Sequence, residues 1–306
     1  METVLITGGT GMIGTALTLF LKESGYRIII LTREKEKLGE KDGIKYAYWN
    51  PENNEMDTAL LNQIDHIIHL AGANIGNGKW TKRKKKEIKD SRIIGTRFLM
   101  EQLTRQPNKV RSFISASATG YYRQGGDLLL KEKEPAAGDF LGEVCVSWEA
   151  EAQSITTLGI RVAILRTGLV MSASGGMLPA LVRPLKSGIA PIPGSGQQWI
   201  SWIHVRDLAR LYATAIVNKD FNGIFNATAP FPVTQLQLVT QLAHIIKGKN
   251  YLPFYCPAFL LRLFMGEKGL ELLKSIRVSD EKLLQTGFEF SFPTIGSALE
   301  DLYGEK

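Results

Sequence analysis

Short apolar runs alternate with longer amphipathic segments along most of this chain. Runs rich in β-branched residues are typical of buried strands. The clearest of them begin at positions 4, 27, 65, 110 and 161. Segments with a helical spacing of apolar residues lie between several of them, such as 140–158. This alternation predicts an α/β fold with a doubly wound parallel sheet.

The first strand leads directly into a glycine-rich turn. Gly8, Gly11 and Gly14 follow the run Val4 to Thr7, and a good helix former follows them. In this context Gly8 permits a tight turn, Gly11 lets the backbone approach a pyrophosphate, and Gly14 allows close packing of the helix. The amide groups at the helix N-terminus would hold the pyrophosphate. The stretch therefore predicts a dinucleotide site of the Rossmann type.

The residues after the second strand bear on the choice of cofactor. Arg33 comes directly after Thr32, and its planar fork would suit a 2′-phosphate. Glu34 is the rival, because a carboxylate there would accept hydrogen bonds from the ribose of NAD. We favour NADP(H) over NAD(H).

Other candidate site residues follow later strands. Small residues at 71–73 leave room for a cofactor, and His69 before them reads as a core residue, because no metal cluster surrounds it. Ser117 and the two tyrosines at 121 and 122 fall where a parallel sheet exposes its carboxyl edge. The residues expected at the cofactor are Gly8, Thr10, Gly11, Met12, Ile13, Gly14, Thr32, Arg33, Leu70, Ala71, Gly72, Ala73, Arg92, Ser115, Arg166 and Gly168.

The composition changes from Ser172 onward, and the stretch 175–196 is rich in glycine and proline. Such loops beyond a sheet often bind substrate. A strand should end near Val205, and Asp207 can cap the next helix. We expect a dinucleotide-binding domain of residues 1–170 plus about 200–228. Residues 171–199 plus 229–306 should form a smaller, mostly helical substrate-binding domain.

Composition describes an ordinary soluble protein of 306 residues, with 44% hydrophobic and 22% charged residues. We find no apolar run long enough for a membrane span and no room for a signal peptide before the first strand. The two cysteines, Cys145 and Cys256, lie far apart and suggest a reduced, cytoplasmic compartment. We expect neither a membrane nor a metal as partner.

Much of the net charge of +7 comes from the run Lys79 to Lys86. A basic run with an aromatic residue can bind nucleic acid. We interpret it as the solvated start of a helix, because no nucleic-acid module accompanies it, and we expect no nucleic-acid partner.

Several motifs together resemble the extended short-chain dehydrogenase/reductase family. The resemblance is closest to its atypical "epimerase family" branch, which is similar to nucleoside-diphosphate-sugar epimerases and often of unknown substrate. The resemblance covers nearly the whole chain and implies a Rossmann-type cofactor domain with a smaller substrate domain. The motifs are Thr7-Gly-Gly-Thr-Gly-Met-Ile-Gly, His69-Leu-Ala-Gly, Ser115-Ala-Ser-Ala-Thr-Gly-Tyr-Tyr, Arg166-Thr-Gly-Leu-Val and Gly194-Ser-Gly-Gln-Gln-Trp-Ile-Ser-Trp-Ile-His.

One departure from that family affects the chemistry. The wider family uses a Tyr-x-x-x-Lys pair on the helix after the serine loop, in which the lysine lowers the pKa of the tyrosine. Here Leu141 and Cys145 occupy the places of the pair, whereas Ser117 matches the catalytic serine. The cofactor-binding motifs of the family are therefore present, whereas its usual catalytic pair is missing.

Two functions follow as hypotheses. The first is an NADP(H)-dependent oxidoreductase or epimerase acting on an unidentified small carbonyl or hydroxyl substrate. Ser117 would polarise the substrate, and Tyr121, Tyr122 or Glu143 would carry the proton, with Arg92 or Arg166 near the tyrosine. The second is a regulatory protein that binds NADP(H) without turning it over.

The oligomeric state stays open in the sequence. Members of the wider family often dimerise through the two helices after the third strand and the serine loop. Like charges in the run Lys82 to Lys86 would oppose that contact.

Overall fold

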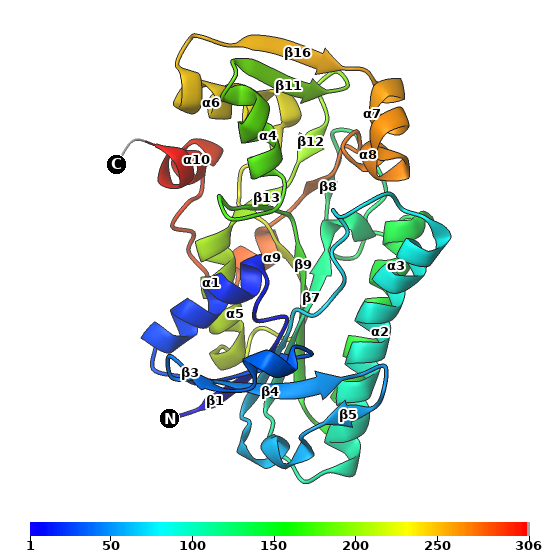
Figure 1. Cartoon of the computed structure of the whole chain (residues 1–306), viewed down its shortest axis with the longest axis vertical. Coiled ribbons are helices and arrows are strands. Elements are labelled where there is room, and N and C mark those ends of the chain that lie inside the picture. Colours follow the sequence, from blue (N-terminus) through cyan, green and yellow to red (C-terminus); the bar gives the residue numbers. More distant parts are fainter. Residues whose placement is uncertain (305–306) are drawn as a thin grey trace.

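A nine-stranded sheet forms the centre of the computed structural model, which describes residues 1–304 (Figure 1). Seven strands run parallel in the order β14-β9-β7-β6-β1-β2-β4, whereas β3 and β5 pair antiparallel with β4. This strand order confirms the predicted parallel sheet. Its strands are β1 (Thr3–Thr7), β2 (Arg27–Thr32), β3 (Gly39–Lys41), β4 (Ile44–Asn50), β5 (Glu55–Met56), β6 (His66–His69), β7 (Ser112–Ala118), β9 (Arg161–Thr167) and β14 (Gly223–Ala227).

Helices cover both faces of this sheet (Figure 1). One face packs against α1 (Met12–Glu23) and α5 (Val205–Val217), and the other against α2 (Lys82–Arg105) and α3 (Phe140–Ser154). Successive residues of β1 alternate between the two cores: Val4 belongs to the first and Leu5 to the second. A sheet buried on both faces explains why its strands read as continuous apolar runs.

Local capping fixes where the helices begin. The Thr81 hydroxyl accepts a hydrogen bond from the Lys84 amide, and the Asp139 carboxylate accepts one from the Gly142 amide. At α5 our expectation was wrong, because His204 Nδ1 caps the helix by accepting from the Arg206 amide. The buried Asp207 carboxylate instead accepts from the backbone amides of residues 291 and 292 and so ties the C-terminal segment to α5.

A third core lies beyond the carboxyl edge of the sheet and is built from the later segments. It contains α4 (Leu178–Leu185), α6 (Gln235–Lys247) and α10 (Ile295–Tyr303). Above it, β11 (Ile189–Pro193) pairs in parallel with β16 (Leu252–Cys256), a strand that we did not predict. The remaining short elements are β8 (Leu129–Leu130), β10 (Leu169–Met171), β12 (Trp199–Ile200), β13 (Trp202–His204), β15 (Val233–Thr234), β17 (Arg277–Val278), α7 (Ala258–Met265), α8 (Glu267–Glu271), α9 (Glu281–Leu284) and four 3₁₀ helices at 35–37, 58–63, 119–121 and 155–158.

The predicted domain boundaries stay a prediction, although the third core lies where we placed the smaller domain. Residues 305 and 306 of that predicted domain lie outside the described residues. Within residues 1–304, none of the helices combines the length and the apolar character needed to cross a bilayer.

Candidate functional site

The glycine turn joins β1 to α1 at the carboxyl edge of the sheet. Gly8 has a φ of 70°, which favours glycine, and a Cβ there would lie 2.9 Å from the Leu70 carbonyl carbon. A Cβ on Gly14 would lie only 2.3 Å from the Gly8 carbonyl oxygen. The helix therefore packs directly on the turn, and these two glycines are required by the protein's own backbone.

Gly11 differs from its two neighbours in the motif. Its φ of −79° and ψ of 173° suit any residue, and a Cβ there would meet only the Gly8 carbonyl oxygen, at 3.4 Å. The packing of the protein therefore does not demand glycine at this position. Gly11 stands at the N-cap of α1, in front of the unpaired amides of Met12 and Ile13. A glycine here leaves room for a phosphate at the helix N-terminus.

The carboxyl end of β2 presents the two rival residues for the ribose. Arg33 is exposed, and within the described residues it takes part in no hydrogen bond or ion pair. Glu34 is paired with Lys37, with 2.8 Å between the carboxylate oxygen and Nζ. The Thr32 hydroxyl accepts from the Glu34 amide at 3.1 Å and shapes this turn. The guanidinium is thus free to receive an anion, whereas the carboxylate already has a cation.

The loop after β6 lies against the glycine turn. The Thr7 hydroxyl accepts from the Ala71 amide at 3.1 Å and lies 2.7 Å from His69 Nδ1. His69 is fully buried, and burial lowers its pKa to about 3. It is a neutral core residue, as the sequence indicated. Within residues 1–304, His, Cys, Asp and Glu side chains form no group of three that could hold a metal.

Arg92 reaches from α2 over this loop. Its Nη1 donates to the carbonyl oxygens of Ala73 (3.3 Å) and Ile88 (2.9 Å), and its Cζ lies 5.1 Å from the centre of the Trp148 ring. A Cβ on Gly72 would lie 3.1 Å from that Cζ, so glycine lets the guanidinium approach the loop. Burial lowers the pKa of Arg92. No carboxylate pairs with it among residues 1–304, which leaves further N–H groups for a ligand.

Ser117 belongs to a buried polar network that sequence reasoning missed. Its hydroxyl donates to Glu149 Oε1 at 2.6 Å. Arg166 holds both carboxylate oxygens of Glu149 through Nε and Nη2, each at 2.8 Å. Burial opposes the charged form of Arg166, but the Glu149 carboxylate and the Tyr122 hydroxyl raise its pKa above the usual value. The serine hydroxyl is thus already engaged by the protein.

The three candidate proton carriers occupy different environments. Tyr122 is fully buried, donates to Asn226 Oδ1 at 2.6 Å and has its pKa raised to about 12 by burial. Tyr121 is half-buried, with the Arg166 Cζ 3.3 Å from its ring centre. Glu143 is exposed in the first turn of α3. Among the three, only Tyr121 is both partly accessible and beside a cation.

The helix that carries the catalytic pair in the wider family is apolar at the matching places. Leu141 is half-buried against Gly120, and Cys145 is buried with its Sγ 3.8 Å from the Ala118 carbonyl oxygen. Burial raises the pKa of Cys145 to about 11, so the thiol stays protonated at neutral pH. Neither side chain can replace the proton transfer of a tyrosine.

Two expected cofactor residues have structural roles. The buried Ser115 hydroxyl donates to the Ala116 carbonyl oxygen at 3.0 Å. A Cβ on Gly168 would lie 2.6 Å from the Ser201 carbonyl oxygen, so close strand packing requires this glycine. Thr10 is exposed in the turn. Met12 lies close to Gly175, because a Cβ on Gly175 would be 3.1 Å from the Met12 sulfur.

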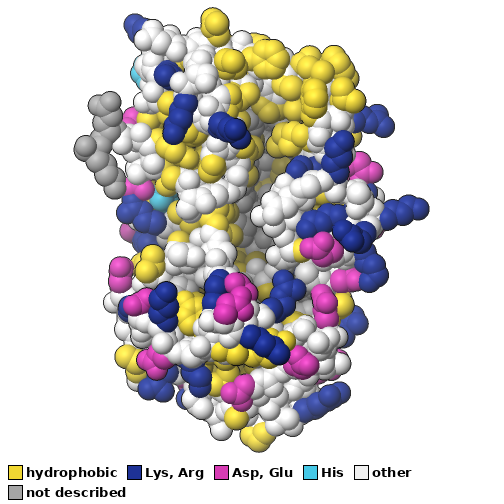
Figure 2. All heavy atoms as spheres, in the orientation of Figure 1, with side chains coloured by type: hydrophobic (Ala, Val, Ile, Leu, Met, Phe, Trp, Pro, Cys, Tyr) yellow, Lys and Arg dark blue, Asp and Glu magenta, His cyan; other side chains and the backbone are white. Residues whose placement is uncertain are grey.

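The site opens into a hollow between the sheet and the later segments, visible along the middle of Figure 2. Polar contacts bridge the two sides of this hollow. Lys274 pairs with Asp139 at 2.8 Å, and Lys268 Nζ donates to the Gly76 carbonyl oxygen at 2.6 Å. Lys85, from the basic run, pairs with Glu267 of α8.

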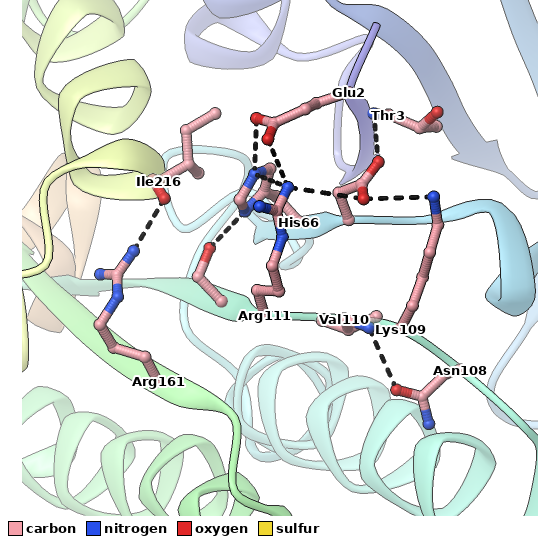
Figure 3. Close-up of polar contacts among 11 residues, drawn as sticks. Glu2, Thr3, His66, Asn108, Lys109, Val110, Arg111, Arg161 and Ile216 are labelled. Carbon is pink, nitrogen blue, oxygen red and sulfur yellow. Dashed lines mark hydrogen bonds and ion pairs between the residues drawn. The ribbon is translucent and has the colours of Figure 1, made fainter.

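A second charged cluster lies at the opposite, amino edge of the sheet (Figure 3). Glu2 contacts His66 Nε2 at 3.1 Å and pairs with Arg111. Asp65 accepts from the Thr3 amide at 2.9 Å. These charges satisfy one another and tie the strand ends together, so the cluster does not form a rival site.

Comparison with known proteins fits this geometry. A model of the NAD dependent epimerase/dehydratase family matches residues 4–227, and a domain of unknown function (DUF1731) matches residues 256–302. The chain belongs to the NAD dependent epimerase/dehydratase family. An epimerase family protein of Staphylococcus saprophyticus is 37% identical over 305 residues and 99% of each chain. One of Mycobacterium bovis is 35% identical over 298 residues, 97% of this chain and 96% of its own.

Solved structures share the whole fold. A human epimerase family protein with NADPH aligns over 99% of both chains, with a TM-score of 0.86 and 27% identity. A nucleoside-diphosphate sugar epimerase from Corynebacterium glutamicum has a TM-score of 0.77 and 32% identity, and the match covers 99% of this chain and 58% of that one. The predicted Rossmann-type fold and the family resemblance are both confirmed.

Proposed function

We propose that this protein binds NADP(H) across the carboxyl edge of its sheet and acts as an oxidoreductase or epimerase-like enzyme. Its substrate would be a small carbonyl or hydroxyl compound such as a nucleotide sugar. The pyrophosphate would lie on the Met12 and Ile13 amides above Gly11, and Arg33 would hold the 2′-phosphate. The nicotinamide would supply or accept a hydride when bound.

The contrast between Arg33 and Glu34 carries the choice of NADP(H). The carboxylate that would bind the ribose of NAD is held by Lys37, whereas the guanidinium is unpaired among the described residues. The human relative solved with NADPH supports the same choice. Arg92 has free donors at the loop after β6, which suits a further contact with the cofactor.

Calorimetric titration with NADPH, NADP, NADH and NAD tests this proposal. One charge-assisted hydrogen bond is worth about 1.5–3 kcal/mol, so Arg33→Ala should raise the dissociation constant for NADPH about 10- to 100-fold. Its affinity for NADH should not change. Arg27→Ala removes the same charge at the other, amino end of β2 and serves as the control.

Two outcomes would contradict the proposal. Equal or tighter binding of NADH would move the ribose contact to Glu34. Binding of none of the four nucleotides would leave the glycine turn as a structural element only.

For the chemistry, we propose Ser117 as the group that polarises a substrate hydroxyl by accepting a hydrogen bond from it, because the proton of Ser117 is donated to Glu149. We propose Tyr121 as the strongest of the three candidate proton carriers. Tyr121 is partly accessible beside the Arg166 guanidinium. Tyr122 would have to give up a buried hydrogen bond, and Glu143 is exposed on α3. Tyr121→Phe and Ser117→Ala should each abolish turnover of a substrate found by a carbonyl screen that follows NADPH absorbance.

A second candidate function is an NADP(H)-binding regulator without turnover. It is favoured by the engagement of Ser117 with Glu149 and by the apolar residues Leu141 and Cys145 on α3. A regulator would bind NADPH in the calorimeter, would bind a protein partner, and would oxidise no NADPH in the screen. Turnover that Ser117→Ala abolishes would exclude this alternative.

A further inference from the structure

Helix α7 is apolar almost all round, yet little of the protein covers it. Its sequence, Ala-Phe-Leu-Leu-Arg-Leu-Phe-Met, has a single polar residue, Arg262, and only Leu261 is buried. Phe259 and Phe264 are 68% and 71% exposed. A helix that is hydrophobic on every side is normally buried. We therefore expect a second molecule to cover α7.

The exposed surface continues from α7 onto the neighbouring strand. β16 ends at Cys256 and α7 begins at Ala258, so the two elements adjoin, and Figure 2 shows apolar atoms gathered over this upper end of the molecule. Ile189 of β11 pairs with Leu252 and extends the surface. We define the α7–β16 patch by six large apolar residues, each between 46% and 75% exposed: Ile189, Leu252, Phe254, Phe259, Leu263 and Phe264.

The size of the α7–β16 patch matches a stable protein interface. With about 150–250 Å² for a large side chain, these residues expose on the order of 800 Å². The largest apolar patch on a typical monomer is about 300–600 Å². A standard interface buries about 800 Å² on each partner. The patch is therefore larger than a monomer usually tolerates and sufficient for a dimer.

The face that the wider family uses for dimers exposes far fewer large apolar side chains. On α2 and α3, Val146 is the one large apolar residue that is strongly exposed in the described chain. Charged pairs occupy this face instead, such as Arg97 with Glu151 and Lys86 with Asp90. Charged residues are depleted at the core of interfaces, so these helices are a poor choice for association.

The charges around the patch favour a protein surface over a lipid surface. A helix that lies on a membrane carries lysine and arginine along its polar face. α7 has Arg262 alone, and on α8 Lys268 donates to the Gly76 carbonyl oxygen while Glu267 pairs with Lys85. Lys268 and Lys85, the lysines beside α7 and α8, thus face the hollow and not the patch.

We propose that the α7–β16 patch is the interface of a homodimer, in which a second copy of this chain covers α7. One apolar surface can pack against its own copy across a two-fold axis, which is the commonest symmetry of soluble oligomers. We expect contact between helices and side chains, because Pro253 removes one of the hydrogen-bond donors from the free edge of β16. The Leu252 amide donates to the Gly188 carbonyl oxygen, so Pro253 faces the free edge, where it has no N–H to offer.

Sedimentation velocity of the full chain over a wide range of concentration tests this dimer. The wild-type protein should sediment as a dimer. Phe264→Glu buries an unpaired charge in each half of the interface and should raise the dimer dissociation constant more than about tenfold. Val146→Glu makes the same change on the α2 and α3 face and should leave the dimer intact. Hydrogen-exchange protection of the α7 amides should also rise with wild-type concentration.

Several results would overturn the proposal. A wild-type monomer at all concentrations would do so, and if that monomer also floated with vesicles of anionic lipid, a membrane would be the occupant. A dimer that survives Phe264→Glu but is lost in Val146→Glu would place the interface on α2 and α3. Both variants replace exposed residues, so circular dichroism and NADPH binding should match the wild type. The oligomer and cofactor proposals are thus tested separately.

Discussion

Two glycines of the same motif should respond in opposite ways to the same substitution. At Gly14, an added Cβ would lie 2.3 Å from the Gly8 carbonyl oxygen and 2.5 Å from Gly9 Cα. These are backbone atoms, and favourable contacts begin at about 3.5 Å, so α1 would have to move away from the turn. Overpacking of this kind costs about 1–3 kcal/mol or more. Gly14→Ala should therefore destabilise the folded protein.

Gly11→Ala should leave stability nearly unchanged. The nearest atom to its Cβ would be 3.4 Å away, and its backbone conformation suits alanine. Alanine would reduce the entropy of the unfolded chain by about 0.4–1 kcal/mol, whereas it is a poorer N-cap than glycine by a similar amount. However, the methyl group would project towards the proposed pyrophosphate. Each charge-assisted bond lost to the helix amides should weaken NADPH binding about 10- to 100-fold.

Urea unfolding and calorimetric titration of both variants measure these two effects. Gly296→Ala, in the first turn of α10 and with its Cβ in ordinary contact with Gln241, is the matched control. Wild-type affinity in Gly11→Ala would show that no pyrophosphate lies over this glycine. Wild-type stability in Gly14→Ala would refute the packing argument.

Three further changes test the buried groups. Glu149→Gln should cost about 3–5 kcal/mol in urea unfolding, because it leaves the Arg166 guanidinium buried without its partner, and Glu149→Leu with Arg166→Met should recover part of this loss. Burial lowers the pKa of His69 from about 6.5 in the unfolded chain to about 3 in the folded protein, so each unit by which the pH falls between about 6 and about 3 should remove about 1.4 kcal/mol of stability. His69→Gln should flatten that slope in unfolding at pH about 5 and about 7, and an unchanged slope would contradict the burial of a neutral imidazole. Cys145→Ser should leave NADPH binding unchanged, whereas stronger or weaker binding would give this helix position a role at the cofactor.

The order of elements and the glycine turn were predictable because both depend on residues that are close together in the sequence. Strands buried on both faces give continuous apolar runs, and the strand, turn and helix at 3–23 are consecutive residues. Even the rival positions Arg33 and Glu34 could be named. Their states could not, because the pairing of Glu34 with Lys37 depends on the path of the chain after β2.

The network around Ser117 could not be predicted from local sequence. Glu149 lies 32 positions from Ser117 and Asn226 lies 104 from Tyr122, so only the sheet brings these groups together. Arg166, which directly follows the apolar run 162–165 of β9, was a signal that could have indicated a buried ion pair.

The sequence by itself determined the parallel sheet, the glycine turn and the family, because these depend on periodicity and on glycines at fixed spacing. Only the tertiary structure decided which hydroxyls are engaged, that His204 and not Asp207 caps α5, and that α7 remains uncovered. Each of these depends on which distant segments meet, and contact between distant segments is set by the packing of the whole chain.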